Sequence, residues 1–154
     1  MHSNDLLKKL SDGGFLKTHT KDTPQAKKLL TRAFRDIKSA KANLKIDEEV
    51  AYTLAYLAML RSGRALMFLK GLRPVDGGQH MTVVKVTGYF LGAGYDALIY
   101  KFDKMRQKRN QLTYEPDLPL GLRDAEKAIE TAEEFMRQIL KQVMKENPQL
   151  ELNI

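Results

Sequence analysis

Apolar residues recur at three- and four-residue steps along most of this 154-residue chain, which is the spacing of an amphipathic helix. The pattern is clearest over residues 24–44 and 121–146, and it also covers residues 95–113. Residues 50–69 are rich in Ala, Leu and Met on most sides, so we expect a helix at the centre of the fold. A shorter amphipathic segment at residues 3–11 comes first. The spacing thus predicts four long helices and a short N-terminal one.

Capping residues and helix breakers mark the ends of these segments. Thr23–Pro24 is typical of an N-cap followed by the first helical position. Asp47 is a second N-cap, and the acidic residues after it suit the positive end of a helix dipole. Glycine and proline interrupt residues 70–79, and Asn147–Pro148 ends the last pattern.

Residues 79–91 carry two conflicting signals. Their β-branched residues favour a strand by propensity, but a lone strand would have no partner in this chain, so we expect a short helix. Together, these segments predict an all-α fold, an up-and-down bundle of four long helices plus one or two short helices. We expect a single domain over residues 1–154, with a short helix and connector at 1–22 and a tail at 148–154.

Composition narrows the class of protein. The chain has no Cys, which excludes a disulfide framework and a thiolate metal site. It contains no run of 18 apolar residues that would span a membrane, and its first residues lack the apolar core of a signal peptide. We therefore expect a cytoplasmic protein without a membrane segment. The formal net charge of +7 favours polyanionic partners such as RNA or nucleotides, although surplus surface lysine explains the same balance.

One charged residue stands in an otherwise apolar helix face. Leu98, Phe102, Met105, Arg109 and Leu112 follow one another at steps of four, three, four and three, within a stripe roughly 80° wide. A buried guanidinium is costly unless it is paired. The arginine pairs with a carboxylate inside the fold, extends its charged head into water, or lines a cleft or subunit interface where an anion binds.

Further cations flank this stripe. One side of the predicted helix carries Lys101, Lys104 and Lys108. These lysines form either a solvated basic face or an edge that contacts phosphate. Arg106 lies on the opposite flank, where Asp103 can offset its charge or bind Gln107. The two interpretations of the lysines differ in the salt dependence that they predict.

His80 and Tyr114 are the remaining candidates for chemistry. His80 follows a pair of glycines, a setting that suits either an ordinary half-exposed histidine or acid–base work. It has no metal-binding neighbours at suitable spacing, so we expect no metal and no cofactor. Tyr114 lies about 140° around the helix from Arg109. The two converge only if the helix ends near Thr113, as Pro116 suggests, or if two subunits contribute.

The segment "KMRQKRNQLTYEP", residues 104–116, resembles the signature of the HEPN superfamily, whose members are compact helical bundles. That signature is an Arg followed by a polar residue near the end of a late helix, with a His four to six residues after the Arg. Arg109 and Asn110 match its first two positions, and Tyr114 occupies the His position. The earlier segment resembles the connector and short helix of a prokaryotic subgroup at Arg73, Gly78, His80, Thr82 and Val83.

The resemblance implies one of two functions. Many HEPN proteins cleave RNA without a metal, using the Arg and the His across a dimer, and many are the toxin of a two-gene toxin–antitoxin module with a small nucleotidyltransferase. Others lack the His and bind RNA or nucleotides, or serve as scaffolds that pair with a nucleotidyltransferase-type partner. A phenol with a reference pKa of about 10 is a poor base at neutral pH, so Tyr114 suits binding better than proton transfer. His80 replaces the missing imidazole only if the fold brings it near Arg109.

The resulting prediction is a homodimer that binds RNA or a nucleotide phosphate in a basic cleft at its interface. Arg109 would anchor the phosphate, Asn110 would orient Arg109 or accept from the ribose, and Tyr114 would line the same cleft. If cleavage occurs, the catalytic candidates are Arg109, Tyr114 and His80. The predicted phosphate-binding and steering cations are Lys101, Lys104, Lys108 and Arg73.

Overall fold

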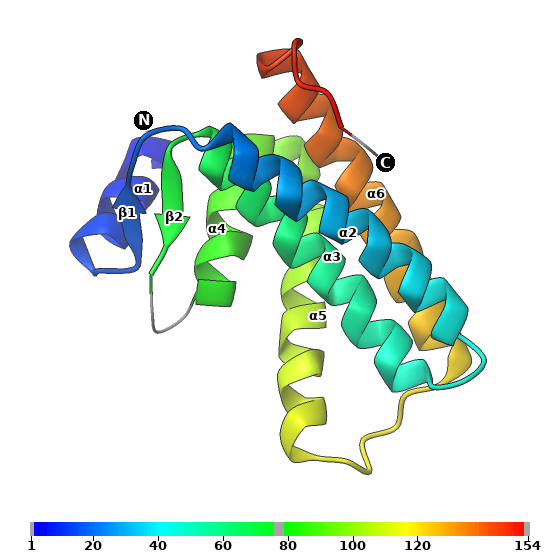
Figure 1. The fold of residues 1–154 in the computed structure, drawn as a ribbon. Coiled ribbons are helices and arrows are strands. Elements are labelled where there is room, and N and C mark those ends of the chain that lie inside the picture. Colours follow the sequence, from blue (N-terminus) through cyan, green and yellow to red (C-terminus); the bar gives the residue numbers. More distant parts are fainter. Residues whose placement is uncertain (1, 76–78, 153–154) are drawn as a thin grey trace.

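The computed structural model describes residues 2–75 and 79–152. Four long helices and two short ones carry most of these residues, and two very short strands pair beside them (Figure 1). The predicted all-α bundle is therefore confirmed, whereas its extent as one domain over the whole chain stays a prediction. The elements in chain order are α1 (His2–Asp12), β1 (Leu16–Thr18), α2 (Thr23–Asn43), α3 (Glu48–Leu69), β2 (Leu72–Pro74), α4 (Gln79–Leu91), a 3₁₀ turn (Ala93–Tyr95), α5 (Asp96–Tyr114) and α6 (Leu122–Glu146).

Helix α3 occupies the centre of the bundle, as its apolar composition predicted. It packs against α2 and α6 along its length and also contacts α4, α5 and β2. Small side chains such as Ala55, Ala58 and Ala65 are fully buried and allow neighbouring helices to approach closely. Helix α5 diverges from α3 and α6 toward its C-terminal end (Figure 1). No helix in the described part of the chain is both long and apolar enough to cross a bilayer.

An aromatic cluster joins three of these helices. Phe102 of α5 and Phe135 of α6 are fully buried with ring centroids 4.8 Å apart, and Phe102 lies 5.9 Å from the ring of Tyr56 on α3. The rings are tilted rather than parallel, a geometry that the aromatic quadrupole favours. The cluster therefore fixes where α3, α5 and α6 meet.

The caps agree with the sequence at one helix and differ at another. Asp47 caps α3 as predicted, since its carboxylate accepts from the backbone N–H groups of Glu49 and Val50 at 3.1 and 3.2 Å. The N-cap of α2 is Asp22 rather than Thr23, because the Asp22 carboxylate accepts from the N–H of Gln25 at 3.1 Å. A carboxylate one residue earlier thus performs the capping that we expected of the threonine.

The two strands lie in segments that the sequence predicts as connectors. Strands β1 and β2 pair antiparallel, with Leu16 opposite Pro74 and Thr18 opposite Leu72. Three residues are too few to show the alternation that identifies a strand. The pair is held by burial of Leu16 and Leu72 in the core. Residues 79–91 form helix α4 as predicted, because burial of its valines outweighs their strand propensity.

Gly63 of α3 sets the distance between α3 and α4. A Cβ at this position would lie 2.7 Å from Val83 Cγ1 and 2.8 Å from Thr87 Oγ1. We expect Gly63→Val to lower the free energy of unfolding by about 1–3 kcal/mol, because the buried neighbours must move. Urea unfolding followed by circular dichroism measures this. Gly94→Val is the control, since a Cβ there meets nothing within 4 Å, and equal effects of the two variants would contradict the prediction.

Candidate functional site

His80 lies in the first turn of α4 and is held by a tyrosine of α3. Its Nδ1 is 2.8 Å from the hydroxyl oxygen of Tyr56, and the two rings stack at a centroid distance of 5.8 Å. Tyr56 is fully buried and belongs to the aromatic cluster with Phe102. The core therefore orients the imidazole through one buried phenol.

The structure brings His80 together with Arg109. A cavity of about 260 Å³, which we call the α4–α5 hollow, lies between the start of α4 and the middle of α5. Among the described residues, the lining contains cationic, amide and imidazole groups but no acidic side chain, a composition that suits an anion. The lining residues are Gln79, His80 and Met81 from α4, and Arg106, Arg109 and Asn110 from α5.

Arg109 is half-buried, and no carboxylate of the described residues lies within 4.0 Å of its guanidinium. The internal salt bridge that the sequence left open is therefore not seen in residues 2–75 and 79–152. Its neighbour Arg106 does have a partner, since its Nε donates to Asp103 at 2.8 Å. Asp103 also accepts from Gln107 at 2.9 Å, so both contacts predicted for this aspartate are present.

Burial and the surrounding positive charges both favour the neutral form of the His80 imidazole. Burial lowers the pKa of His80, and the charges of Arg109, Arg106 and Arg64 lower it further. Burial also raises the pKa of the Tyr56 phenol well above its ordinary value, although the two arginines of α5 oppose the change. Both groups are thus uncharged at pH 7. In the tautomer whose Nδ1–H donates to the Tyr56 oxygen, His80 Nε2 is left as an acceptor.

Arg64 is a further cation that the sequence analysis missed. Its Nε is buried without a hydrogen-bond partner among the described residues. Burial lowers the pKa of Arg64, and the nearby charge of Arg61 lowers it further. A signal was present in the sequence, because these two arginines are the only charged residues between positions 50 and 69. Cations in so apolar a helix indicate a role beyond solubility.

Two predicted site residues lie away from the hollow. Tyr114 is the last residue of α5, is 83% exposed and does not line the hollow. Helix α5 continues to Tyr114 instead of ending before it, so Tyr114 and Arg109 of one chain point to different sides of the helix. Arg73 is exposed on β2 opposite Lys17 and also lies outside the lining. Gly78, which matched the subgroup connector, lies outside the described residues.

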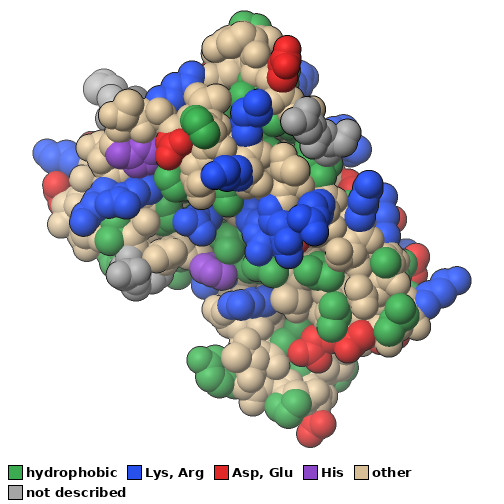
Figure 2. Space-filling model, viewed as in Figure 1, with side chains coloured by type: hydrophobic (Ala, Val, Ile, Leu, Met, Phe, Trp, Pro, Cys, Tyr) green, Lys and Arg blue, Asp and Glu red, His purple; other side chains and the backbone are tan. Residues whose placement is uncertain are grey.

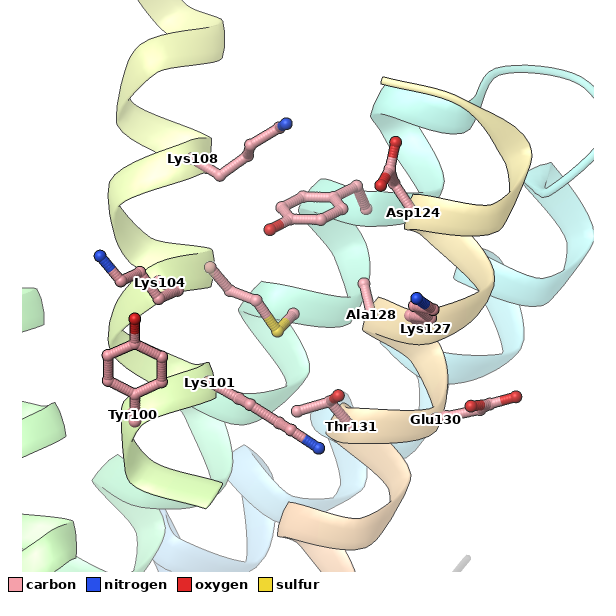
Figure 3. A pocket seen from close by; sticks show the side chains of 11 residues that line it. Tyr100, Lys101, Lys104, Lys108, Asp124, Lys127, Ala128, Glu130 and Thr131 are labelled. Carbon is pink, nitrogen blue, oxygen red and sulfur yellow. The ribbon is translucent and has the colours of Figure 1, made fainter. Parts of the chain in front are cut away.

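The three predicted steering lysines face a different depression. Lys101, Lys104 and Lys108 line a pocket of about 540 Å³ between α5, α6 and α3 (Figure 3). Arg109 is not among the residues that line it. The side chains of Lys101 and Lys108 extend from α5 toward α6, whereas the Lys104 ammonium lies 5.3 Å from the ring centroid of Tyr100. Asn110 is exposed and does line the α4–α5 hollow. One helix thus presents two separate basic surfaces.

Comparison with known proteins agrees with this architecture. A family model described as "HEPN domain" matches residues 26–143, which run from α2 into α6 and include His80 and Arg109. Neither a curated protein nor a solved structure matches the chain. Because the matched span is well over half of the sequence, the chain belongs to the HEPN domain family.

Proposed function

We propose that this HEPN domain binds the phosphate groups of RNA, or of a nucleotide, in the α4–α5 hollow. Its family supports a general RNA-related or nucleotide-binding role. The observation that supports this location is that His80, Arg106 and Arg109 line one cavity, to which the residues of 2–75 and 79–152 contribute no acidic side chain. A guanidinium without a carboxylate partner is available to a phosphate.

Each lining side chain has a chemical part in this proposal. Arg109 forks onto two phosphate oxygens, which its planar guanidinium fits. Arg106 adds charge but is held in place by Asp103, so its contribution is smaller. Asn110 presents an amide that can donate to phosphate or accept from a ribose hydroxyl. The neutral imidazole of His80 can accept one hydrogen bond at Nε2, and in this form it does not repel the neighbouring cations.

Arg109→Gln tests the proposal. We expect it to weaken binding of an uncleavable 12-nucleotide 2′-O-methyl RNA about 10- to 100-fold, since hydrogen bonds to charged groups contribute about 1.5–3 kcal/mol. Fluorescence anisotropy at several salt concentrations measures the affinity, and the salt slope falls by about 0.7 for one lost phosphate contact. Lys8→Gln on α1 is the control of equal charge. An affinity unchanged by Arg109→Gln would contradict this phosphate site.

Metal-independent RNA cleavage is the second candidate, and the position of a neutral His80 beside Arg109 favours it. Nε2 of His80 would take the proton of a ribose 2′-hydroxyl as its oxygen attacks the adjacent phosphorus. The bond from phosphorus to the 5′-oxygen breaks, and that oxygen takes a proton from water. The imidazolium of His80 then gives its proton to the hydroxide that remains, which restores the neutral base. The products are a 2′,3′-cyclic phosphate and a 5′-hydroxyl. Arg109 would stabilise the charge that develops on the phosphoryl oxygens.

The predicted assemblies rest on the family resemblance alone. In the proposed homodimer, Tyr114 of one subunit reaches the α4–α5 hollow of the other subunit. The side chain of Tyr114 is 83% exposed and is therefore free to do so. A nucleotidyltransferase-type partner and a toxin–antitoxin role remain proposals of the same kind. The scaffold alternative makes two different predictions for Arg109→Gln. Binding of the partner protein persists in this variant, and any RNA affinity is unchanged.

A further inference from the structure

Helix α2 presents a positively charged surface to solvent. It contains one acidic residue, Asp36, which is 1% exposed, so the charged side chains that reach solvent along this helix are all cationic. Figure 2 shows Lys and Arg side chains gathered over the middle of α2 and α3, while acidic side chains on this face gather mainly near the α2–α3 connection. The six cations of α2 are Lys27, Lys28, Arg32, Arg35, Lys38 and Lys41.

Part of this surface is concave. A depression of about 300 Å³ lies on α2 and has no acidic side chain in its lining. Lys28 and Arg35 are exposed there, and neither forms an ion pair among the described residues. The lining residues are Lys27, Lys28, Thr31, Arg32 and Arg35.

Two arginines of α3 connect this depression with the α4–α5 hollow. The buried carboxylate of Asp36 pairs with Arg32 of α2 at 3.5 Å and also with Arg61 of α3, whose side chain is 28% exposed. Arg64 follows Arg61 by three residues and therefore lies on the same side of α3. Arg64 has a buried Nε without a partner, and its charge acts on His80 at the edge of the hollow. Arg61 is thus joined to α2 through Asp36, and Arg64 lies within electrostatic range of His80. These two arginines and the cations of the two depressions are called the cationic series.

We propose that this series is a track for the backbone of an RNA strand several nucleotides long, running from the α4–α5 hollow across Arg64 and Arg61 to the cationic face of α2. The proposal rests on phosphate binding in the hollow and adds the class of ligand, a polynucleotide rather than a mononucleotide. A mononucleotide fills the hollow alone and leaves the cations of α2 unused. A strand supplies further phosphates to cations of α2 that form no ion pair among the described residues, such as Lys28 and Arg35. It also gives the Arg64 Nε donor an acceptor.

Affinities for a long and a short ligand test the track. The ligands are a 12-nucleotide 2′-O-methyl RNA and the corresponding dinucleotide, and the variant is Lys28→Gln/Arg35→Gln, which leaves the ion pairs of Asp36 intact. We expect the double variant to weaken 12-mer binding about tenfold and to lower its salt slope by about 1.4, the value for two lost phosphate contacts on a single strand. Dinucleotide binding stays unchanged. Thermal unfolding by circular dichroism verifies that the variant is folded.

The control is Lys8→Gln/Lys9→Gln, which removes the same charge from exposed positions of α1. The track is overturned if this control weakens 12-mer binding as much as the α2 variant does, or if poly-glutamate of matched length competes as well as RNA. It is also overturned if the α2 variant binds the 12-mer normally while Arg109→Gln does not, a result that leaves phosphate binding in the hollow standing. Normal binding by both variants removes the proposed function itself.

Discussion

His80→Ala is expected to reduce metal-independent RNA cleavage by about 10²- to 10⁴-fold, the range that a positioned general base contributes. RNA affinity should change by less than about threefold, because the arginines of the hollow that hold phosphate remain. The measurement is a single-turnover assay with protein in excess over a structured RNA, in the presence of EDTA. Binding of the uncleavable 12-mer is measured alongside it, so that loss of catalysis is separated from loss of affinity.

The pH profile of the same reaction has a defined sign. A base acts in its neutral form, so the rate rises with pH through the pKa of His80 and is constant above it. Since burial and three arginines lower that pKa below the ordinary value of 6.5, the rate should be constant through neutral pH and fall only in more acidic solution. Arg109→Gln removes one of these charges and should therefore move the acidic limb toward higher pH.

Tyr56→Phe is the matched control for the position of His80. It keeps the ring of the aromatic cluster and removes the hydroxyl that lies 2.8 Å from Nδ1. We expect a loss of cleavage of about tenfold, smaller than that of His80→Ala, because the imidazole remains but is less well oriented. No cleavage by the unmodified protein at high excess, or full cleavage by His80→Ala, would remove the catalytic role and leave binding alone.

Local signals predicted the helices because each long helix combines a periodic apolar face with recognisable ends. Asp47 and the Asn147–Pro148 pair identify such ends directly. The strands β1 and β2 left no such signal, since their pairing depends on residues more than fifty positions apart that the helices bring together. The shift of the α2 cap to Asp22 is a similar case, because two adjacent residues were both competent to cap.

The candidate site was predictable only in parts. Arg109 was conspicuous because it interrupts an apolar face, and His80 because it follows two glycines. Their meeting depends on how α4 packs against α5, which a periodic pattern does not encode. Tyr56 and Arg64 were missed for the same reason, since they face the site from a helix that is apolar on most sides. Tyr114 was selected by resemblance to a motif, and its position at the exposed end of α5 separates it from Arg109 in one chain.

Phe135→Ala should be the most destabilising of the substitutions considered, with a loss of about 3–5 kcal/mol in the free energy of unfolding. Phe135 is fully buried, its ring centroid is 4.8 Å from that of Phe102, and its Cζ is 3.9 Å from the position of a Cβ on Gly63. Truncation therefore removes contacts to α5 and leaves a cavity beside the α3–α4 contact. Close-packed helices relax only partly around such a cavity, so most of its cost remains.

Urea unfolding at fixed protein concentration measures this loss, and an unchanged slope with urea indicates that the cooperative transition is preserved. Arg137→Ala on the same helix is the control, because its side chain is 68% exposed and its ion pair among the described residues is with Glu134, across one turn. It should change stability by less than about 0.5 kcal/mol. A loss below about 1 kcal/mol for Phe135→Ala would mean that the aromatic cluster does not hold α5 against the bundle, and the position of Arg109 beside His80 would then lack its structural support.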